Sequence, residues 1–254
     1  MVHKSGNRPT GTGREPAPIK GPARLAARRD ARRERVLDAA MGVVEREGFA
    51  GLTVVRLAAE LGQSVGALYR TFPGKAGLLV ALQLRAISSL QAEVTLAQRE
   101  AAHQTHRSRP HKRVVALSLV LSSLRPFIDD HRLAPARYAL LDGLLSAPDA
   151  VLDDDGLRLV NGALEPLFGA VAQGLEAAAE HGALEPGDAA LRTRILWAAL
   201  HGLDHLRKRD RGEPKRLRSP ALVRGMLWSL LRGFGADPGE LDDALALALP
   251  RAAG

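Results

Sequence analysis

Apolar residues recur along this chain mainly at spacings of three and four, which is the spacing of one face of an α-helix. Val36, Ala40, Val43 and Val44 share such a face and predict a first helix over about residues 30–47. Segments of the same kind extend almost to the C-terminus, so the pattern predicts an all-α protein. Beyond residue 111, helices are expected at about 112–128, 132–146, 156–181, 187–209, 219–234 and 239–248.

Two short helices are predicted after the first. Thr53 is suited to cap a helix that ends at Leu61, and Gly62 suits the turn that follows. Ser64 is suited to cap the next helix, in which Leu68 and Phe72 lie four residues apart on the buried side. A Pro-Gly break then leads into a long helix over about residues 75–102.

This succession of a short helix, a Gly turn, a second short helix and a break is the layout of a helix-turn-helix. Such a unit places its second helix in the major groove of DNA, while neighbouring groups bind phosphates. The sequence between residues 52 and 79 therefore predicts a three-helix DNA-binding domain near the N-terminus.

Composition supports a helical protein and narrows its class. Ala and Leu dominate the 46% of residues that are apolar, and aromatic residues make up only 4%. Ala and Leu favour helices, whereas strands favour β-branched and aromatic residues. The absence of cysteine excludes disulfides and thiolate metal sites. Because no apolar run approaches the roughly 20 residues of a membrane helix, and no signal peptide is visible, we expect a cytoplasmic protein.

The net charge of +8 lies entirely in the first third of the chain. Residues 1–85 contain 15 Lys and Arg against 7 Asp and Glu, whereas residues 86–254 contain 21 of each. A basic excess confined to the region of the helix-turn-helix indicates a polyanionic partner. An Arg-rich composition unrelated to binding would instead spread the excess along the chain.

The stretch from about residue 33 to residue 82 resembles the N-terminal domain of the tetracycline-repressor (TetR) family of transcriptional regulators. Two positions depart from the family pattern. Gln63 follows the turn glycine where an apolar residue is usual, and Gly74 precedes the lysine where a Ser-type cap is frequent. The matching residues are Phe49 to Thr53, Leu57-Ala58, Leu61-Gly62, Ser64 to Arg70, Phe72, Lys75 and Leu78-Leu79.

The resemblance implies how the first domain would contact DNA. Thr53, Tyr69 and Lys75 resemble phosphate contacts, which position a protein without reading sequence. The exposed face of the third helix is expected to read bases, with Arg70 able to bind guanine. The expected DNA-binding set is Thr53, Arg56, Gln63, Ser64, Val65, Gly66, Ala67, Tyr69, Arg70, Thr71 and Lys75, in which Arg56 is a phosphate contact, and Val65 and Ala67 are contacts to thymine methyls.

Three parts are expected. The N-terminal composition, rich in Gly, Pro and basic residues, predicts a disordered basic arm over residues 1–29. The resemblance implies a DNA-binding domain over residues 30–80 and a helical domain for ligand binding and dimerisation over residues 81–250. The arm either enters the minor groove beside the reading helix or is a tail without function. Residues 103–111 are expected as a polar linker, and the dimer is expected to form through helices 187–209 and 219–234, with Leu227 and Leu230 in the seam.

The ligand pocket is implied by the resemblance and not by pattern. Trp197, His201 and Gly202 resemble a Trp-x-x-x-His-Gly stretch found in one branch of the family. The expected ligand-binding residues are Arg137, Tyr138, Trp197 and His201, and Phe127 and Phe168 are better explained as core. His201 and His205 have the spacing of a metal-chelating pair, but no third ligand is apparent, so a pocket or interface histidine is the favoured interpretation.

Together these features favour a ligand-responsive DNA-binding transcriptional regulator, a repressor, that binds a palindromic operator as a homodimer. The alternative is a small-molecule-binding regulator that acts mainly through a protein partner. An all-α enzyme would need a catalytic polar cluster, which the sequence lacks, and we expect no cofactor, no metal and no membrane partner. The identity of the small-molecule effector and the sequence of the operator are not encoded in these patterns.

The localised charge predicts that affinity for double-stranded DNA falls steeply with salt. Each phosphate neutralised by Lys or Arg releases counterions and contributes about −0.9 to the slope of log K against log salt. A titration between about 50 and 200 mM salt, followed by fluorescence anisotropy, should give a slope of several units. A flat response would contradict DNA binding and favour the protein-partner alternative.

Overall fold

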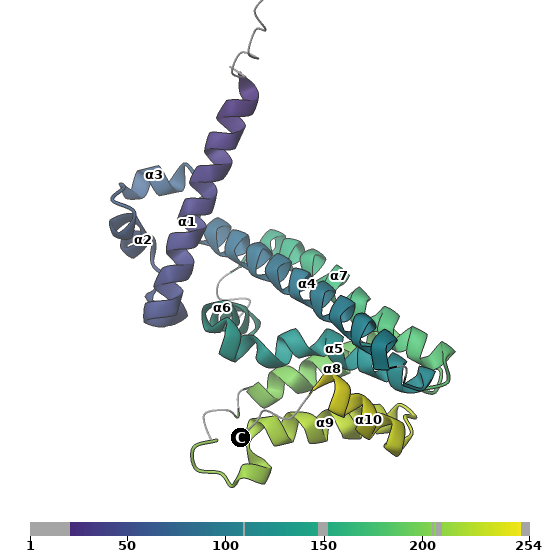
Figure 1. The fold of residues 1–254 in the computed structure, drawn as a ribbon. Helices are drawn as coiled ribbons and strands as arrows, with labels where there is room; N and C mark the ends of the chain where they lie inside the picture. The colour runs from purple at the N-terminus through teal and green to yellow at the C-terminus, as the bar shows by residue number, and fades with distance from the viewer. Residues whose placement is uncertain (1–20, 109, 147–151, 205, 207–209, 250–254) are drawn as a thin grey trace, which may run out of the picture.

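The computed structural model describes residues 21–108, 110–146, 152–204, 206 and 210–249, and all regular structure within these ranges is helical (Figure 1). The expected all-α fold is confirmed. None of the described helices is long and apolar enough to cross a membrane. The elements are α1 (Pro22–Gly51), α2 (Val54–Glu60), α3 (Val65–Tyr69), α4 (Gly74–Ser108), α5 (Lys112–Leu133), α6 (Pro135–Ser146), α7 (Asp154–Glu180), α8 (Ala189–Asp204), the 3₁₀ turn η3 (Lys215–Leu217), α9 (Ser219–Gly233) and α10 (Pro238–Ala248).

Helix α1 begins earlier than the sequence suggested. It starts at Pro22, so residues 22–29, which were assigned to the disordered arm, are helical. Proline is favourable in the first turn because its missing N–H is not needed there. Residues 23–31 are exposed, and Figure 1 shows this end of α1 projecting beyond α2 and α3. The remainder of the expected arm, residues 1–20, lies outside the described residues.

The two short helices begin at the predicted caps. Thr53 Oγ1 accepts a hydrogen bond from the N–H of Arg56 at 3.1 Å, and Ser64 Oγ accepts one from the N–H of Ala67 at 3.2 Å. In the turn between the helices Gly62 has a φ of +59°, a conformation that glycine adopts without steric cost. Side-chain caps therefore satisfy donors at the starts of both α2 and α3.

The N-terminal helices share a hydrophobic core with later parts of the chain. Val43 and Leu57 are buried in one cluster with Leu79 of α4, Leu140 of α6 and Val160 of α7. Figure 1 shows α4 running as one straight helix from beside α1 to the far end of the molecule, along α7. Because α4 is continuous to Ser108, the expected domain boundary at residue 80 falls inside a helix, and most of the expected 103–111 linker is helical.

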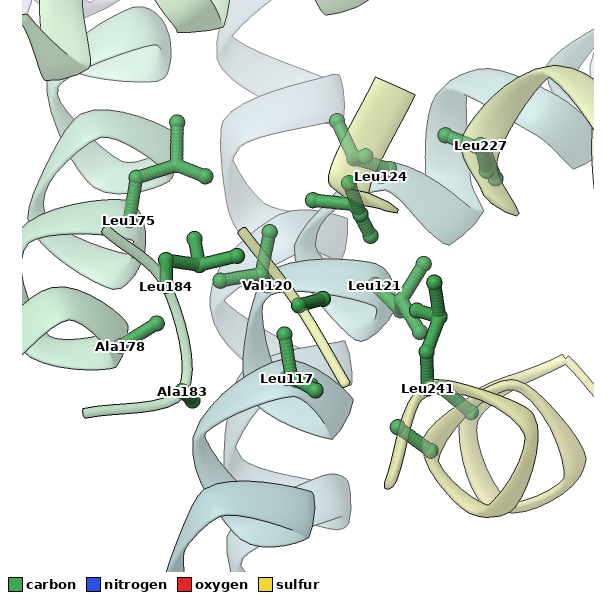
Figure 2. Close-up of a cluster of buried hydrophobic side chains, with 14 of the residues drawn as sticks. Leu117, Val120, Leu121, Leu124, Leu175, Ala178, Ala183, Leu184, Leu227 and Leu241 are labelled. Atoms are coloured by element: carbon green, nitrogen blue, oxygen red, sulfur yellow. The ribbon is translucent and has the colours of Figure 1, made fainter. Parts of the chain in front are cut away.

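A second core holds the C-terminal part together. Figure 2 shows Leu117, Val120, Leu121 and Leu124 of α5 at its centre, facing side chains from α7, α9 and α10. Leu227 of α9 is fully buried in this core. The expectation that Leu227 lies in a dimer seam is therefore wrong, because the residue packs within its own chain.

Candidate DNA-binding surface and ligand pocket

The outer side of α3 is the first candidate functional surface. Tyr69 is 48% exposed, and Gly66 and Arg70 are exposed as well, as expected for a reading helix. Ala67 does not share this face. It is buried beside Leu68, so its assignment as a contact to a thymine methyl is wrong. A helix of five residues that packs on α1 and α2 must bury adjacent positions, which simple helical spacing did not capture.

The expected phosphate contacts border the same surface. Thr53 is exposed at the start of α2, and Lys75 is exposed in the first turn of α4. Gly74, which stands where a Ser-type cap was expected, has a φ of +76°. A serine would be strained in that conformation, so the backbone at the start of α4 explains this departure from the family pattern.

Arg56 is already engaged within the protein. Its Nη2 and Nε lie 2.7 Å and 2.9 Å from Glu47 Oε1, and Nη2 is 3.7 Å from Glu60 Oε2. The hydrogen bond from Arg56 lowers the pKa of Glu47, and the same bond raises the pKa of Arg56. A phosphate would therefore have to compete with Glu47 for the guanidinium.

Two further positions of the predicted set are held by internal hydrogen bonds. Gln63 Oε1 accepts a hydrogen bond from Nη2 of Arg32 at 3.1 Å. The hydroxyl of Thr71 donates to the carbonyl of Ala67 at 3.4 Å. Val65 is partly buried against the N-terminal core. The side chains on α3 and its flanks that remain exposed and chemically suited to DNA are thus chiefly Tyr69 and Arg70.

A pocket lies between α4, α5, α6, α7 and α8. It is narrow, with room of about 60 Å³ for water-sized molecules, and it is partly open to solvent. Its walls are mostly aliphatic and aromatic, with three polar side chains on one part of the lining, which is typical of small-molecule sites. The lining residues are Ile87, Leu90, Phe127, Tyr138, Leu141, Asp142, Leu164, Leu167, Trp197, Leu200 and His201.

Three of the four expected ligand-binding residues line this pocket, and one does not. Tyr138, Trp197 and His201 are in its walls. Arg137 is buried elsewhere: its Nη1 and Nη2 donate to the carboxylate of Glu93 at 2.6 Å and 2.8 Å. This two-point ion pair links α6 to α4, and the expectation that Arg137 binds ligand is wrong because its side chain turns away from the cavity.

The polar part of the pocket contains an imidazole and a carboxylate. His201 Nε2 lies 3.5 Å from Asp142 Oδ1, which joins α8 to α6. The imidazole also stacks on Trp197, with ring centroids 5.3 Å apart, and Phe168 packs edge-on against the indole. Phe168 therefore supports the pocket wall from behind, whereas Phe127, which was expected as core, lines the cavity. His205, the other half of the considered metal pair, lies outside the described residues.

Comparison with known proteins finds a match for the N-terminal helices. Residues 36–82 match the family model for bacterial regulatory proteins of the tetR family. This matching segment is called the TetR-type domain below. No curated protein matched the sequence.

Solved structures extend the likeness beyond residues 36–82 to the whole fold. RolR in complex with resorcinol has a TM-score of 0.59 at 16% identity, covering 89% of this chain and 96% of RolR. A tetR-family regulatory protein from Rhodococcus RHA1 gives 0.56 at 20%, with coverages of 81% and 97%. A putative transcriptional regulator from Saccharomonospora viridis in complex with choline gives 0.55 at 17%, with coverages of 80% and 96%. At these identities the likeness concerns the fold.

Sequence reasoning about the TetR-type domain missed two features. Val55, an apolar residue of α2, was not predicted to be exposed, yet it is 70% exposed. Arg32 was treated only as part of the basic excess, yet its side chain reaches α3. The apolar pocket residues were also missed, because their spacing does not distinguish a cavity wall from ordinary core.

We expect the cap at Ser64 to contribute measurably to the stability of the TetR-type domain. Ser64→Ala should lower the free energy of unfolding by about 0.5–2 kcal/mol, because the N–H of Ala67 loses its side-chain acceptor and keeps only the carbonyl of Ser64. Ser64→Asp should retain most of the stability. Thermal unfolding followed by circular dichroism measures both.

The matched control for the cap is Ser88→Ala, which removes a hydroxyl from an exposed position inside α4. That change should leave the stability unchanged or raise it slightly, since alanine is the better helix former. Equal unfolding temperatures for Ser64→Ala and the unaltered protein would contradict the capping role.

Proposed function

We propose that this protein is a ligand-responsive transcriptional repressor that binds a palindromic operator as a homodimer. The observation that carries the proposal is the TetR-type helix-turn-helix, with exposed Tyr69, Arg70 and Lys75, at the basic end of the chain. This unit is joined through a continuous α4 to a helical part that contains a pocket. Two reading heads related by a two-fold axis would match the two halves of a palindrome.

The DNA contacts divide into two kinds. Tyr69, at the end of α3, and Thr53 and Lys75, at the starts of α2 and α4, are suited to phosphates. Arg70 and Thr71 directly follow α3 and are suited to bases, by a two-point contact to guanine in the case of Arg70. Thr71 reaches a base only when its hydroxyl leaves the carbonyl of Ala67. Arg56 joins the phosphate contacts only when it leaves Glu47.

The exposed sides of α8 and α9 supply a dimer surface. Leu191 is 57% exposed and Ile195 is 38% exposed, and the same face of α8 carries the exposed Ala198 and Gly202. On α9 small residues are exposed at positions 221, 225 and 229. Small side chains let helices approach closely, so two such pairs of helices can form a four-helix bundle. The buried Leu196 and Leu227 stabilise each subunit from within.

Helix α6 is suited to transmit the presence of a ligand to the DNA-binding part. Leu140 of α6 is buried in the N-terminal core, while its neighbours Leu141 and Asp142 line the pocket. The buried Gln83 of α4 donates to the carbonyl of Leu140 at 2.7 Å. A ligand that displaces α6 would therefore act on the helices that carry the reading heads, and would shift their separation away from the operator spacing. Resorcinol and choline, bound by RolR and the S. viridis protein, support a small-molecule effector.

Selection from a random DNA library tests the proposal and separates positioning from reading. The unaltered protein should select a palindrome. Tyr69→Phe and Lys75→Ala should weaken binding to all sequences about equally, because phosphates carry no sequence information. Arg70→Ala should relax the preference at particular base pairs, by about 1–3 kcal/mol for a direct contact.

The outcome that contradicts the proposal is the failure of the unaltered protein to select any palindrome. The reading and positioning roles would be assigned to the wrong side chains if Arg70→Ala left the base preference intact and Tyr69→Phe changed it.

Ile195→Glu should convert the dimer into a monomer and abolish operator binding, because it places a carboxylate in the middle of the proposed seam. Helix content should be kept, since the side chain is already 38% exposed within the subunit. Sedimentation velocity and circular dichroism measure the two effects. Leu159→Glu is the matched control: it places the same charge on α7 at a residue that is 57% exposed, and it should leave the dimer intact. A dimeric Ile195→Glu protein would place the interface elsewhere.

A further inference from the structure

Helix α3 is too short to satisfy its own carbonyl groups. It has five residues, and the last four carbonyls of any α-helix lack a partner within the helix. The chain after α3 satisfies some of them: the N–H of Arg70 donates to Gly66 at 3.3 Å, and those of Thr71 and Phe72 donate to Leu68 at 2.8 Å and 2.9 Å. The carbonyl of Ala67 is bound instead by side chains.

The principal donor to that carbonyl comes from α1. Nη2 of Arg32 lies 3.1 Å from the carbonyl oxygen of Ala67 and 3.1 Å from Oε1 of Gln63. One terminal nitrogen therefore contacts the residue before the cap Ser64 and the third residue of α3. We call Arg32 with its two acceptors the Arg32 tether. A positive charge beside the carbonyl end of a helix is also electrostatically favourable.

The tether is distinct from the exposed arginines of α1. Arg32 is partly buried, whereas Arg28 and Arg29 are exposed one turn earlier. The neighbouring Arg33 places its guanidinium 4.5 Å from the centre of the Phe72 ring, which adds a second contact from α1 to the segment after α3. Both arginines lie on α1 and contact α3 or its flanking residues, which follow 31 to 39 positions later in the sequence.

We propose that Arg32 is a positioning residue that fixes the orientation of α3, and thereby the base preference of the protein, without itself contacting DNA. Gln63 acts in the same unit, as the acceptor that ties the turn to α1, and this explains a polar side chain at a position where an apolar one is usual. The effect on base preference rests on the proposed DNA-binding function, whereas the effect on α3 itself does not.

The test compares Arg32→Met with Arg29→Met in the full chain. Both changes remove one positive charge from α1 and keep an unbranched apolar stem, but only Arg32→Met removes the tether. Hydrogen exchange of the backbone amides of residues 68–72, measured without DNA, should be about tenfold faster in Arg32→Met, because a hydrogen bond from a charged donor is lost. In Arg29→Met the rates should equal those of the unaltered protein.

The second measurement is selection from a random DNA library. Arg32→Met should change which bases are preferred, whereas Arg29→Met should at most lower affinity uniformly. Equal exchange rates in the two variants would overturn the proposal. It would also be overturned if exchange quickened in Arg32→Met while the base preference stayed that of the unaltered protein.

Gln63→Leu keeps the proposal testable should Arg32→Met fail to fold. Leucine restores the apolar residue usual at this position and removes one acceptor, while the bond from Arg32 to Ala67 remains. We expect a smaller rise in exchange and a shift in base preference in the same direction as for Arg32→Met. A Gln63→Leu protein with unchanged exchange and unchanged preference would overturn the tether. If the unaltered protein selected no DNA sequence, the proposed function would fail, while the exchange measurement would still decide whether the tether holds α3.

Discussion

Two helices of seven and five residues are too short to persist in water on their own, because so few backbone hydrogen bonds do not repay the cost of nucleating a helix. The candidate DNA-binding surface therefore depends on contacts that support α2 and α3 from outside. The side-chain caps at Thr53 and Ser64 supply part of it, burial of Leu57 and Leu68 against α1 and α4 supplies another part, and Arg32 binds a carbonyl that α3 leaves open. The candidate DNA-binding surface is thus held in place by contacts on its opposite side.

The same need for support connects the two ends of the molecule. Helix α4 starts beside the turn that follows α3 and continues, without a break, along the wall of the pocket. Helix α6 contributes Leu140 to the N-terminal core and Leu141 to the cavity, and the ion pair of Arg137 with Glu93 fixes α6 against α4. The part of the chain that we propose to read DNA and the part that contains the pocket are therefore not separate bodies on a linker, and a displacement of one would move residues of the other.

Local features of the fold were predictable from sequence, and long-range ones were not. Capping by Thr53 and Ser64 and the turn at Gly62 depend on residues within a few positions of each other, so their chemistry is visible in the sequence. The burial of Ala67 and the pairing of Arg137 with Glu93 depend on which helix packs where. Helical spacing assigns Ala67 to an exposed face, because it does not show that other helices pack over this residue. It also treats Arg137 as a cation available to a ligand, because it does not show that Glu93 of α4 lies beside it. Of the residues that line the pocket, the resemblance to a known family predicted Tyr138, Trp197 and His201 as ligand-binding. The aliphatic lining residues were not predicted.

The ion pair between Arg56 and Glu47 has a consequence for how DNA binding by this surface would respond to ionic strength. A phosphate that takes Arg56 from Glu47 exchanges one ion pair for another, and the carboxylate left behind gathers cations of its own. The ions released from the DNA at that contact are then partly taken up again by the protein. Salt also screens the solvent-exposed ion pair between Arg56 and Glu47, so Arg56 leaves Glu47 more easily at high salt. The contact between Arg56 and a phosphate weakens at the same time. The number of cationic side chains on the surface would accordingly exceed the number of phosphates inferred from the salt dependence of binding.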